Sequence, residues 1–254
     1  MNLELATATH PGRVRSQNED CVAADAEARV AVLADGMGGH NAGEVASRMA
    51  VDLVSSSLKS HRAQAPAADA AQWETLVAAQ IAAANSAVFA AAAGHRQYEG
   101  MGTTLVVVLW HERGVSYGHV GDSRLYLLRD GMLGQLTRDH TIVQEQLERG
   151  AINREQARHA PNRNVLTRAV GIDPKVAPEV RTLPLRQGDV YLLCSDGLTD
   201  MLTDEEIRDT LMSCGTQLHV AAQRLIDRAN ANGGLDNVSV ILARVSSRDR
   251  AGGA

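Results

Sequence analysis

Short apolar runs recur along the chain and have the length of buried strands rather than of helices. They cover residues 30–34, 103–110, 190–194 and 238–245. Looser alternation of apolar and polar positions predicts further strands at residues 3–8, 115–120, 124–129 and 132–136. Asp130-Gly131 is typical of a tight hairpin turn. The segments between residues 115 and 136 are therefore predicted to form an antiparallel meander.

Apolar residues at helical spacing predict helices between these strands. In residues 42–58 the side chains of Val45, Met49 and Leu53 recur one turn apart, which gives the segment one apolar face. Thr203 and Glu206 form the pattern of a capping box, which marks the start of another helix. The predicted helices span residues 42–58, 73–88, 141–149, 154–159, 203–212 and 217–229.

The order of the elements indicates an α+β fold. Strands are followed by two helices, the meander, and then helices and strands again, which favours antiparallel sheets with outer helices over an alternating βαβ fold. A chain of 254 residues forms one large domain or two small ones. Residues 61–72 are the one plausible linker, but two helices side by side on a sheet explain them better. We expect one domain over residues 1–246 and a disordered tail at 247–254.

Composition limits the partners and the compartment. Aromatic residues make up 3% of the chain, so the core must rest on Ala, Val, Leu and Ile. A net charge of −5 with scattered basic residues argues against a nucleic-acid surface. Cys21, Cys194 and Cys214 form no CxxC pair, which favours free thiols in a reducing compartment.

Neither the N-terminus nor the longest Ala-rich segment indicates a membrane protein. The N-terminus shows no basic stretch followed by an apolar core, so no secretory signal is visible. The Ala-rich residues 78–93 are interrupted by Gln80, Asn85 and Ser86, and we interpret them as too short and too polar to span a bilayer. These observations predict a cytoplasmic protein.

Carboxylates occur at the ends of several predicted strands. Asp35-Gly36 follows residues 30–34, at the point where the strand is expected to give way to a flexible glycine loop, and Asp196-Gly197 follows residues 190–194 in the same manner. Asp236 precedes the last strand, and an antiparallel last strand would bring it to the same rim of a sheet. Asp122, between two meander strands, is a fourth candidate. An Asp-Gly pair taken singly is also typical of a turn.

Converging carboxylates favour a site for hard cations. They repel one another unless cations lie among them, and oxygen donors without Cys or His select Mg²⁺ or Mn²⁺ over Zn²⁺. Two such ions sharing one Asp can activate a water molecule and hold a phosphoryl group. Arg15, shortly before Glu19 and Asp20, offers a planar donor for phosphate oxygens, although a single arginine is more often a surface residue.

Eight motifs occur in order along nearly the whole chain. They are Gly12-Arg-Val-Arg15-Ser-Gln-Asn18-Glu19-Asp20, Asp35-Gly-Met-Gly-Gly-His40, Gly102-Thr-Thr104, Gly121-Asp122-Ser-Arg124, Leu136-Thr-Arg-Asp139-His140, Leu166-Thr-Arg168-Ala-Val-Gly171, Ser195-Asp196-Gly197 and Asp236-Asn237. Each is weak alone, but the ordered set is specific. Because of this ordered set of motifs, the sequence resembles the metal-dependent serine/threonine protein phosphatases of type 2C, in their bacterial single-domain form. One departure is His10-Pro11, where the family often has an acidic residue.

The resemblance implies a four-layer α-β-β-α sandwich of two antiparallel sheets flanked by helix pairs. It implies a centre of two Mg²⁺ or Mn²⁺ ions bridged by Asp35, with the Gly36 carbonyl as a further ligand. Asp196 and Asp236 would complete this centre, and Glu19 and Asp20 would act through bound water.

The resemblance also implies the remaining roles. Asp122, with Asp196, would hold a weakly bound third ion, and Arg15 would hold the phosphate. The nucleophile would be a metal-bridging water, so no phosphoenzyme is expected. His40 is the candidate general acid, with local packing as the alternative role.

Substrates and partners follow from the same resemblance. Phosphorylated proteins, the products of a serine/threonine kinase, would be the substrates of a monomeric enzyme that contacts neither nucleic acid nor membrane. Residues 137–170 correspond to the variable flap of the family. Its arginines would either meet the phosphoprotein or lie on solvated surface. They are Arg154, Arg158, Arg163 and Arg168.

Two alternatives stay open beside the phosphatase. A catalytically inactive relative that binds phosphoproteins would usually have lost metal aspartates, and this chain has all of them. A different dimetal phosphoesterase acting on nucleic acid would need a basic surface, which the negative net charge disfavours.

Overall fold

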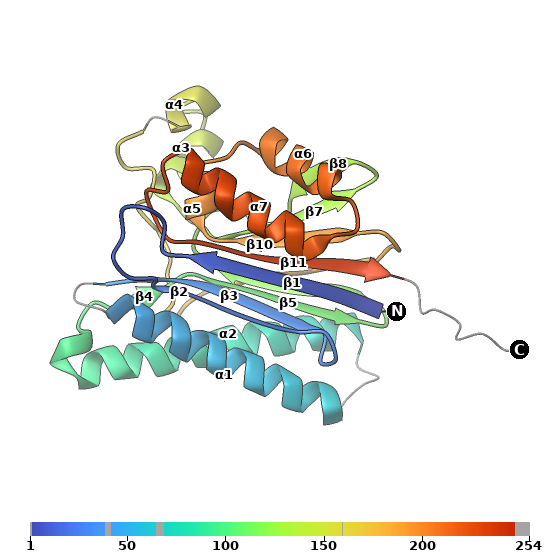
Figure 1. The fold of residues 1–254 in the computed structure, drawn as a ribbon. Helices are drawn as coiled ribbons and strands as arrows, with labels where there is room; N and C mark the ends of the chain where they lie inside the picture. Colours follow the sequence, from blue (N-terminus) through green and yellow to red (C-terminus); the bar gives the residue numbers. More distant parts are fainter. Residues whose placement is uncertain (1, 39–41, 65–68, 159, 247–254) are drawn as a thin grey trace, which may run out of the picture.

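Two antiparallel sheets lie face to face, and helices cover the outer face of each sheet (Figure 1). The computed structural model describes residues 2–38, 42–64, 69–158 and 160–246. The tail expected to be disordered, residues 247–254, lies outside the described residues. The order of layers is helix, sheet, sheet and helix, which confirms the predicted α+β sandwich.

The first sheet joins strands from both ends of the chain. Its order is β1 (Asn2–His10), β11 (Val238–Ser246), β10 (Val190–Cys194), β7 (Arg124–Arg129) and β8 (Met132–Gln135). The order of the second sheet is β2 (Asp20–Asp25), β3 (Val30–Met37), β5 (Leu105–His111), β6 (Gly114–Val120) and β9 (Glu179–Leu183). The two-residue strand β4 (Gly102–Thr103) pairs with the end of β3.

Each sheet carries one pair of long helices. α1 (Ala42–Gln64) and α2 (Ala70–Gly94) cover the second sheet, and α6 (Asp204–Cys214) and α7 (Leu218–Ala231) cover the first (Figure 1). The predicted capping box of Thr203 and Glu206 is present at the start of α6. The short helices are η1 (Arg96–Tyr98), α3 (Ile142–Glu148), α4 (Arg154–Arg158) and α5 (Asp196–Thr199).

The apolar runs are uninterrupted because both faces of their strands are buried. In β3, Ala31 and Leu33 pack against the other sheet, whereas Val30, Val32 and Ala34 pack against the helices. A strand buried on both faces needs no polar alternation.

The layer between the sheets contains the aromatic side chains of Trp110, Tyr117 and Tyr191. Trp110 and Tyr191, from opposite sheets, meet edge to face with ring centroids 5.8 Å apart. Aromatic contacts of this geometry add to the stability gained by burial.

The expected meander is wrong in one respect. β6 and β7 are consecutive strands, but they belong to different sheets, and the chain crosses between the sheets at residues 121–123. Apolar patterning predicts that a segment is a strand without saying which sheet it joins. The predicted hairpin after β7 is confirmed, with left-handed φ angles of 53° at Asp130 and 76° at Gly131.

Some boundaries also differ from the prediction. Helix α1 continues to Gln64, so the expected connection at residues 61–72 is shorter, and residues 65–68 lie outside the described ones. Strands β2 and β9 were not predicted. They are the outer strands of the second sheet and are only half-buried, so their apolar signal is weak.

Helix α2 requires a correction to the sequence interpretation. At 25 residues, with a mean hydropathy of 1.6 in its best window, it is long and apolar enough to cross a membrane by length and composition. In the fold, its buried face packs with α1 and the second sheet through Trp73, Val77, Ile81 and Val88. In this arrangement 33% of that window is buried, so α2 is an outer helix with one face on the sheet.

Replacing Trp110 with alanine should remove one large aromatic contact between the two sheets. Because Trp110 is fully buried, we expect Trp110→Ala to lower the free energy of unfolding by about 3–5 kcal/mol. Urea denaturation followed by circular dichroism measures this change. Met132→Ala, at a side chain that is 72% exposed, is the control and should change stability by less than about 0.5 kcal/mol. Equal effects of the two substitutions would contradict the assigned core.

Candidate metal centre

The candidate aspartates meet at one end of the sandwich, where both sheets contribute. On the second sheet, Asp20 of β2 lies directly opposite Asp35 of β3. On the first sheet, β10 and β11 are antiparallel, as predicted, so Asp196 after β10 lies at the same end as Asp236 before β11. The hydroxyl of Ser195 donates to Asp20 Oδ2 at 2.8 Å and connects the two sheets.

Asp122 reaches this end from the crossover between the sheets. It lies in residues 121–123, between β6 and β7, and its side chain is 9% exposed. Its neighbour Ser123 is hydrogen-bonded through Oγ to Thr104 Oγ1 at 2.7 Å. Asp139 forms an ion pair with Arg124 at 2.7 Å in the same region. The change of sheet, which patterning did not predict, is thus what brings Asp122 to the site.

Asp35 lies inside a strand, and not at the start of a flexible loop as expected. β3 continues through Gly36, which pairs with Thr103 of β4. The Asp35 N–H donates to Thr104 Oγ1 at 2.9 Å, and the Asp35 carbonyl accepts from Thr103 Oγ1 and Thr104 N, both at 2.8 Å. These bonds fix the backbone from which the Asp35 carboxylate projects.

The glycines after the two strand-end aspartates allow close approach of another backbone. A Cβ on Gly36 would lie 2.1 Å from the carbonyl oxygen of Gly43, near the start of α1. A Cβ on Gly197 would lie 2.0 Å from the carbonyl oxygen of Asn237. Any larger residue would push these segments apart. The repeated Asp-Gly pair therefore has a steric cause in both sheets.

Asn237 holds the loop between β1 and β2 against the first sheet. Its Oδ1 accepts from Glu19 N at 2.8 Å, and its Nδ2 donates to the carbonyls of Pro11 and Gln17 at 3.0 and 2.8 Å. Arg15 lies in this loop. The side-chain amide of Asn237 therefore determines where Glu19 and Arg15 enter the site.

Arg15 lies beside the aspartates and remains accessible. Its side chain is 56% exposed, and Nη2 donates to Asp236 Oδ2 at 2.8 Å. The loop is further fixed because Arg13 N donates to the Gly234 carbonyl at 2.7 Å. At the departure from the family pattern, His10 Nδ1 accepts from Gly12 N at 2.9 Å. An exposed guanidinium next to half-buried carboxylates is well placed for a phosphate group.

Burial raises the pKa of four of the aspartates. The pKa of Asp20 rises to about 6 and that of Asp122 to about 7. The pKa values of Asp35 and Asp196 lie well above the ordinary value, through burial first and then through repulsion from neighbouring carboxylates. For Asp35 the largest repulsion comes from Asp20 and the next largest from Asp196, both of which raise its pKa. Without a compensating positive charge, the ionised cluster is unfavourable.

The donor set fits a hard cation. Asp20 Oδ1 is buried and, within the described chain, has no hydrogen-bond partner. Among the described residues, Asp236 alone of the five aspartates has an ion-pair partner, namely Arg15. Carboxylate oxygens of this kind are ligands that Mg²⁺ and Mn²⁺ prefer. The residues present therefore fit the expected ions, while their individual roles as ligands stay predictions.

The flap is attached at this end of the sandwich. Residues 103 and 170 form an isolated bridge, as do residues 141 and 166, and α3 and α4 lie between these anchors. Arg163 pairs with Asp200 at 3.2 Å, and Arg168 Nη1 lies 3.8 Å from Glu179. The side chains of Arg154 and Arg158 lie outside the described residues. So does His40, the candidate general acid.

A comparison with protein families decides the assignment. The model of the protein phosphatase 2C family matches residues 12–232. The chain belongs to the protein phosphatase 2C family. The serine/threonine phosphatase stp of Listeria welshimeri is 40% identical over 237 residues, which cover 92% of each chain. The resemblance inferred from the eight motifs is confirmed.

Solved structures of similar proteins agree with the fold. The serine/threonine phosphatase PstP/Ppp of Mycobacterium tuberculosis matches with a TM-score of 0.88 and 39% identity, covering 97% of this chain and 100% of that chain. The catalytic domain of PstP in complex with two manganese ions matches with a TM-score of 0.86 and 39% identity, covering 97% and 99%. The four-layer sandwich of this protein phosphatase 2C member is therefore confirmed.

Sequence reasoning missed the residues that support the aspartates. Thr104, Ser195 and Asn237 all stand within the quoted motifs, next to the candidate ligands or within the Gly-Thr-Thr pattern. Their hydrogen bonds connect segments far apart in the sequence of this phosphatase 2C chain, for example Asn237 with Gln17. Only the three-dimensional structure reveals these pairs.

Mn²⁺ should stabilise the protein more at higher pH. Folding raises the pKa of Asp20 and Asp122, so their contribution to stability is present at low pH and is lost as the pH rises through about 6 to 7. A cation offsets this loss because it competes with protons for the carboxylates. We expect the increase in Tm caused by about 1 mM Mn²⁺ to be roughly 5 °C larger at pH 7.5 than at pH 5.5.

Differential scanning calorimetry with Mn²⁺ and with chelator measures this difference. Comparing the two states at the same pH cancels the titration of carboxylates elsewhere in the chain. An increase in Tm that is the same at both pH values would contradict proton competition at these aspartates.

Proposed function

We propose that this protein phosphatase 2C member hydrolyses phosphoserine and phosphothreonine monoesters in proteins, using two bound Mg²⁺ or Mn²⁺ ions. The observation that carries the proposal is the convergence of half-buried and buried aspartates with raised pKa values, including Asp20 with its buried, unpartnered Oδ1. The relative PstP, described with two manganese ions, supports this number of ions. Residues 1–246 are proposed to form the one catalytic domain.

The proposal gives the metal-binding residues distinct roles. Asp35 would hold both ions, with the carbonyl oxygen of Gly36 as a further ligand of one. Asp196 and Asp236 would complete the set. Glu19 and Asp20 would contact the ions through bound water. A third, more weakly held ion is assigned to Asp122 with Asp196.

The chemistry is hydrolysis by water rather than by a protein nucleophile. When bound, the ions lower the pKa of a water molecule and offset negative charge on the phosphoryl group. Arg15 contributes a planar set of N–H donors, which hold two phosphate oxygens and fix the direction of attack. His40 is proposed to protonate the leaving serine or threonine oxygen. No phosphoenzyme forms in this scheme.

Phosphoproteins are the substrates implied by the family. A serine/threonine kinase acting in the same cell is proposed as the source of these substrates, and we propose a monomeric, cytoplasmic enzyme without nucleic-acid or membrane partners. Arg163 and Arg168 of the flap are exposed and would contact the phosphoprotein around the site. Arg154 and Arg158 belong to the same proposal.

Phosphomonoester hydrolysis tests the proposed function directly. We expect the protein with Mn²⁺ to release phosphate from a phosphothreonine peptide and from a chromogenic phosphomonoester, and to lose this activity in chelator. A phosphodiester should be cleaved at least about 100-fold more slowly. Peptide binding without hydrolysis would instead indicate an inactive relative, and diesterase activity alone would indicate a different phosphoesterase.

Asp35→Asn should abolish turnover while the fold persists. The amide keeps the size of the side chain but removes the charge that offsets the cations, so kcat should fall by at least about 10³-fold and Mn²⁺ binding should weaken. Steady-state kinetics and isothermal titration calorimetry measure the two effects. Asp52→Asn, on the exposed face of α1, is the matched control and should retain wild-type kinetics. Wild-type rates in Asp35→Asn would overturn the assigned centre.

A further inference from the structure

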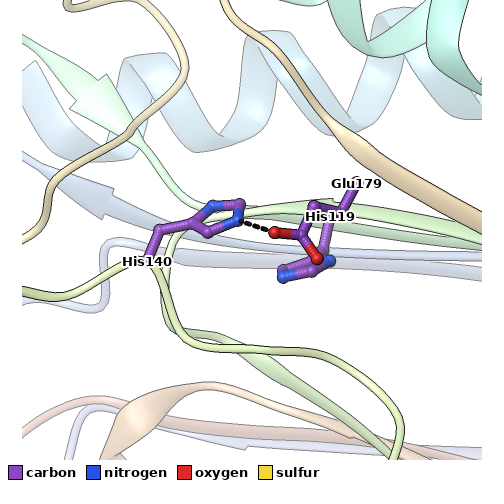
Figure 2. Close-up of side chains that lie close together, drawn as sticks. All are labelled: His119, His140 and Glu179. Carbon is purple, nitrogen blue, oxygen red and sulfur yellow. Dashed lines mark hydrogen bonds and ion pairs between the residues drawn. The ribbon is translucent and has the colours of Figure 1, made fainter. Parts of the chain in front are cut away.

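A second polar cluster lies beside the metal centre, at the base of the flap. It consists of His119 from β6, Glu179 from β9 and His140, which follows β8 (Figure 2). The two histidine rings are stacked, with centroids 4.7 Å apart and planes 17° apart, and they are 1% and 3% exposed. His140 Nε2 lies 3.3 Å from Glu179 Oε1 (Figure 2).

These three residues have the spacing of a metal site, but their hydrogen bonds give them another role. Gly121 N–H donates to His140 Nδ1 at 3.1 Å, so the ring proton of neutral His140 must be on Nε2, facing Glu179. His119 Nε2 lies 2.7 Å from the Arg138 carbonyl and must donate to it. A protonated ring nitrogen has no lone pair for a cation, so Nε2 of His140 and Nε2 of His119 are excluded as ligands, and the lone pair of His140 Nδ1 is already bonded to Gly121. Of these rings, only Nδ1 of His119 keeps a lone pair without a hydrogen-bond partner among the described residues. Arg138 and Arg168 also lie 3.8 Å from Glu179, which adds positive charge.

His140 instead holds Gly121 by both backbone groups. Besides accepting from Gly121 N–H, it donates its own N–H to the Gly121 carbonyl at 3.0 Å. Burial, and then the neighbouring His119 ring, lower the pKa of His140 to about 4, which keeps the ring neutral near pH 7. A neutral ring is required for Nδ1 to accept.

The two hydrogen bonds between His140 and Gly121 form a clamp on the backbone of residue 121. Because Gly121 directly precedes Asp122, this clamp determines where the Asp122 carboxylate enters the site. Gly121 has a left-handed φ of 101°, and a Cβ there would lie 2.7 Å from the Thr104 side chain. The His140 carbonyl accepts from Thr167 N at 2.8 Å, on the returning limb of the flap. One residue therefore connects the flap, the crossover between the sheets and the third-ion aspartate.

We propose that His140 is a positioning residue of the phosphatase, which orients Asp122 by clamping Gly121 and couples that orientation to the flap. The inference rests on the proposed function, because Asp122 matters to turnover only if it holds an ion during phosphoester hydrolysis. His140 itself touches neither ion nor substrate in this proposal. Its effect passes through the backbone of residues 121 and 122.

Two substitutions at residue 140 separate the clamp from the contact with Glu179. His140→Asn retains an acceptor at the position of Nδ1 and loses the reach to Glu179. His140→Gln retains the reach to Glu179 and leaves the buried N–H of Gly121 without an acceptor. Loss of a residue that orients a metal ligand typically costs about 10- to 100-fold in metal affinity or activity.

The test is steady-state hydrolysis of a phosphothreonine peptide over a series of Mn²⁺ concentrations. We expect His140→Gln to lower kcat by about 10- to 100-fold and to raise the Mn²⁺ concentration for half-maximal activity, with KM changed less than about threefold. His140→Asn should restore kcat to within about threefold of the wild type. His219→Gln, exposed on α7, is the control for a His-to-Gln change.

A double substitution shows whether His140 acts through Asp122. If it does, Asp122→Ala with His140→Gln should be no slower than Asp122→Ala alone, within about twofold, because the orientation of an absent carboxylate has no effect. Independent, multiplying losses would overturn the proposal. Equal losses in His140→Asn and His140→Gln would overturn it as well, since the acceptor at Nδ1 would then be irrelevant.

Hydrogen exchange keeps the test valid if His140→Gln does not fold. In the wild type, the Gly121 amide should exchange at least about 100-fold more slowly than an unprotected amide, because its acceptor is buried. Unprotected exchange in the folded wild type would overturn the clamp. A wild type that is inactive on phosphomonoesters overturns the proposed function and this inference together, whereas an active wild type with the wrong variant pattern overturns only the inference.

Discussion

Repulsion among carboxylates at the end of the sandwich is the constraint on which the remaining arrangement depends. Asp122 is buried and Asp20, Asp35 and Asp196 are half-buried, and desolvation raises the pKa of each. Arg15 pairs with Asp236 and leaves these four without an ion-pair partner among the described residues. Four neighbouring carboxylates without ion-pair partners would destabilise the fold if their role were purely structural. The proposed cations would explain their presence, because they would offset the charge of these oxygens; without cations, the ionised cluster lowers stability.

Holding the carboxylates together requires unusually close backbones in two places. Gly36 faces the carbonyl of Gly43, and Gly197 faces that of Asn237, at distances that exclude any Cβ. In each sheet, the glycine after the aspartate lets a neighbouring segment close over the strand end. The two Asp-Gly pairs therefore have the same steric role, one in each sheet. At the second pair, the side-chain amide of Asn237 also holds the loop that carries Arg15.

The sequence predicted most of the elements, and the resemblance predicted the layers. Strands buried on both faces, such as β3, and helices with one apolar face leave strong patterns. Edge strands β2 and β9 leave weak ones, and no local pattern says that β6 and β7 join different sheets. The aspartates could be predicted because carboxylates repeat at strand ends. The residues that support them could not, since Asn237 and Ser195 bind partners 220 and 175 residues away in the sequence, and no local pattern pairs segments so far apart.

Because the site draws residues from both sheets and from the crossover between them, its geometry depends on how the sheets pack. Asp20 and Asp35 belong to one sheet, Asp196 and Asp236 follow and precede strands of the other, and Asp122 lies on the segment that joins them. The distances across the centre therefore depend on how the two sheets pack, and that packing rests on side chains such as Trp110 and Tyr191. Interiors of this kind are densely packed and transmit small displacements. A change in the layer between the sheets can then alter the metal centre without touching any of its residues, and the flap shares this sensitivity because it is anchored to the same crossover through Gly121.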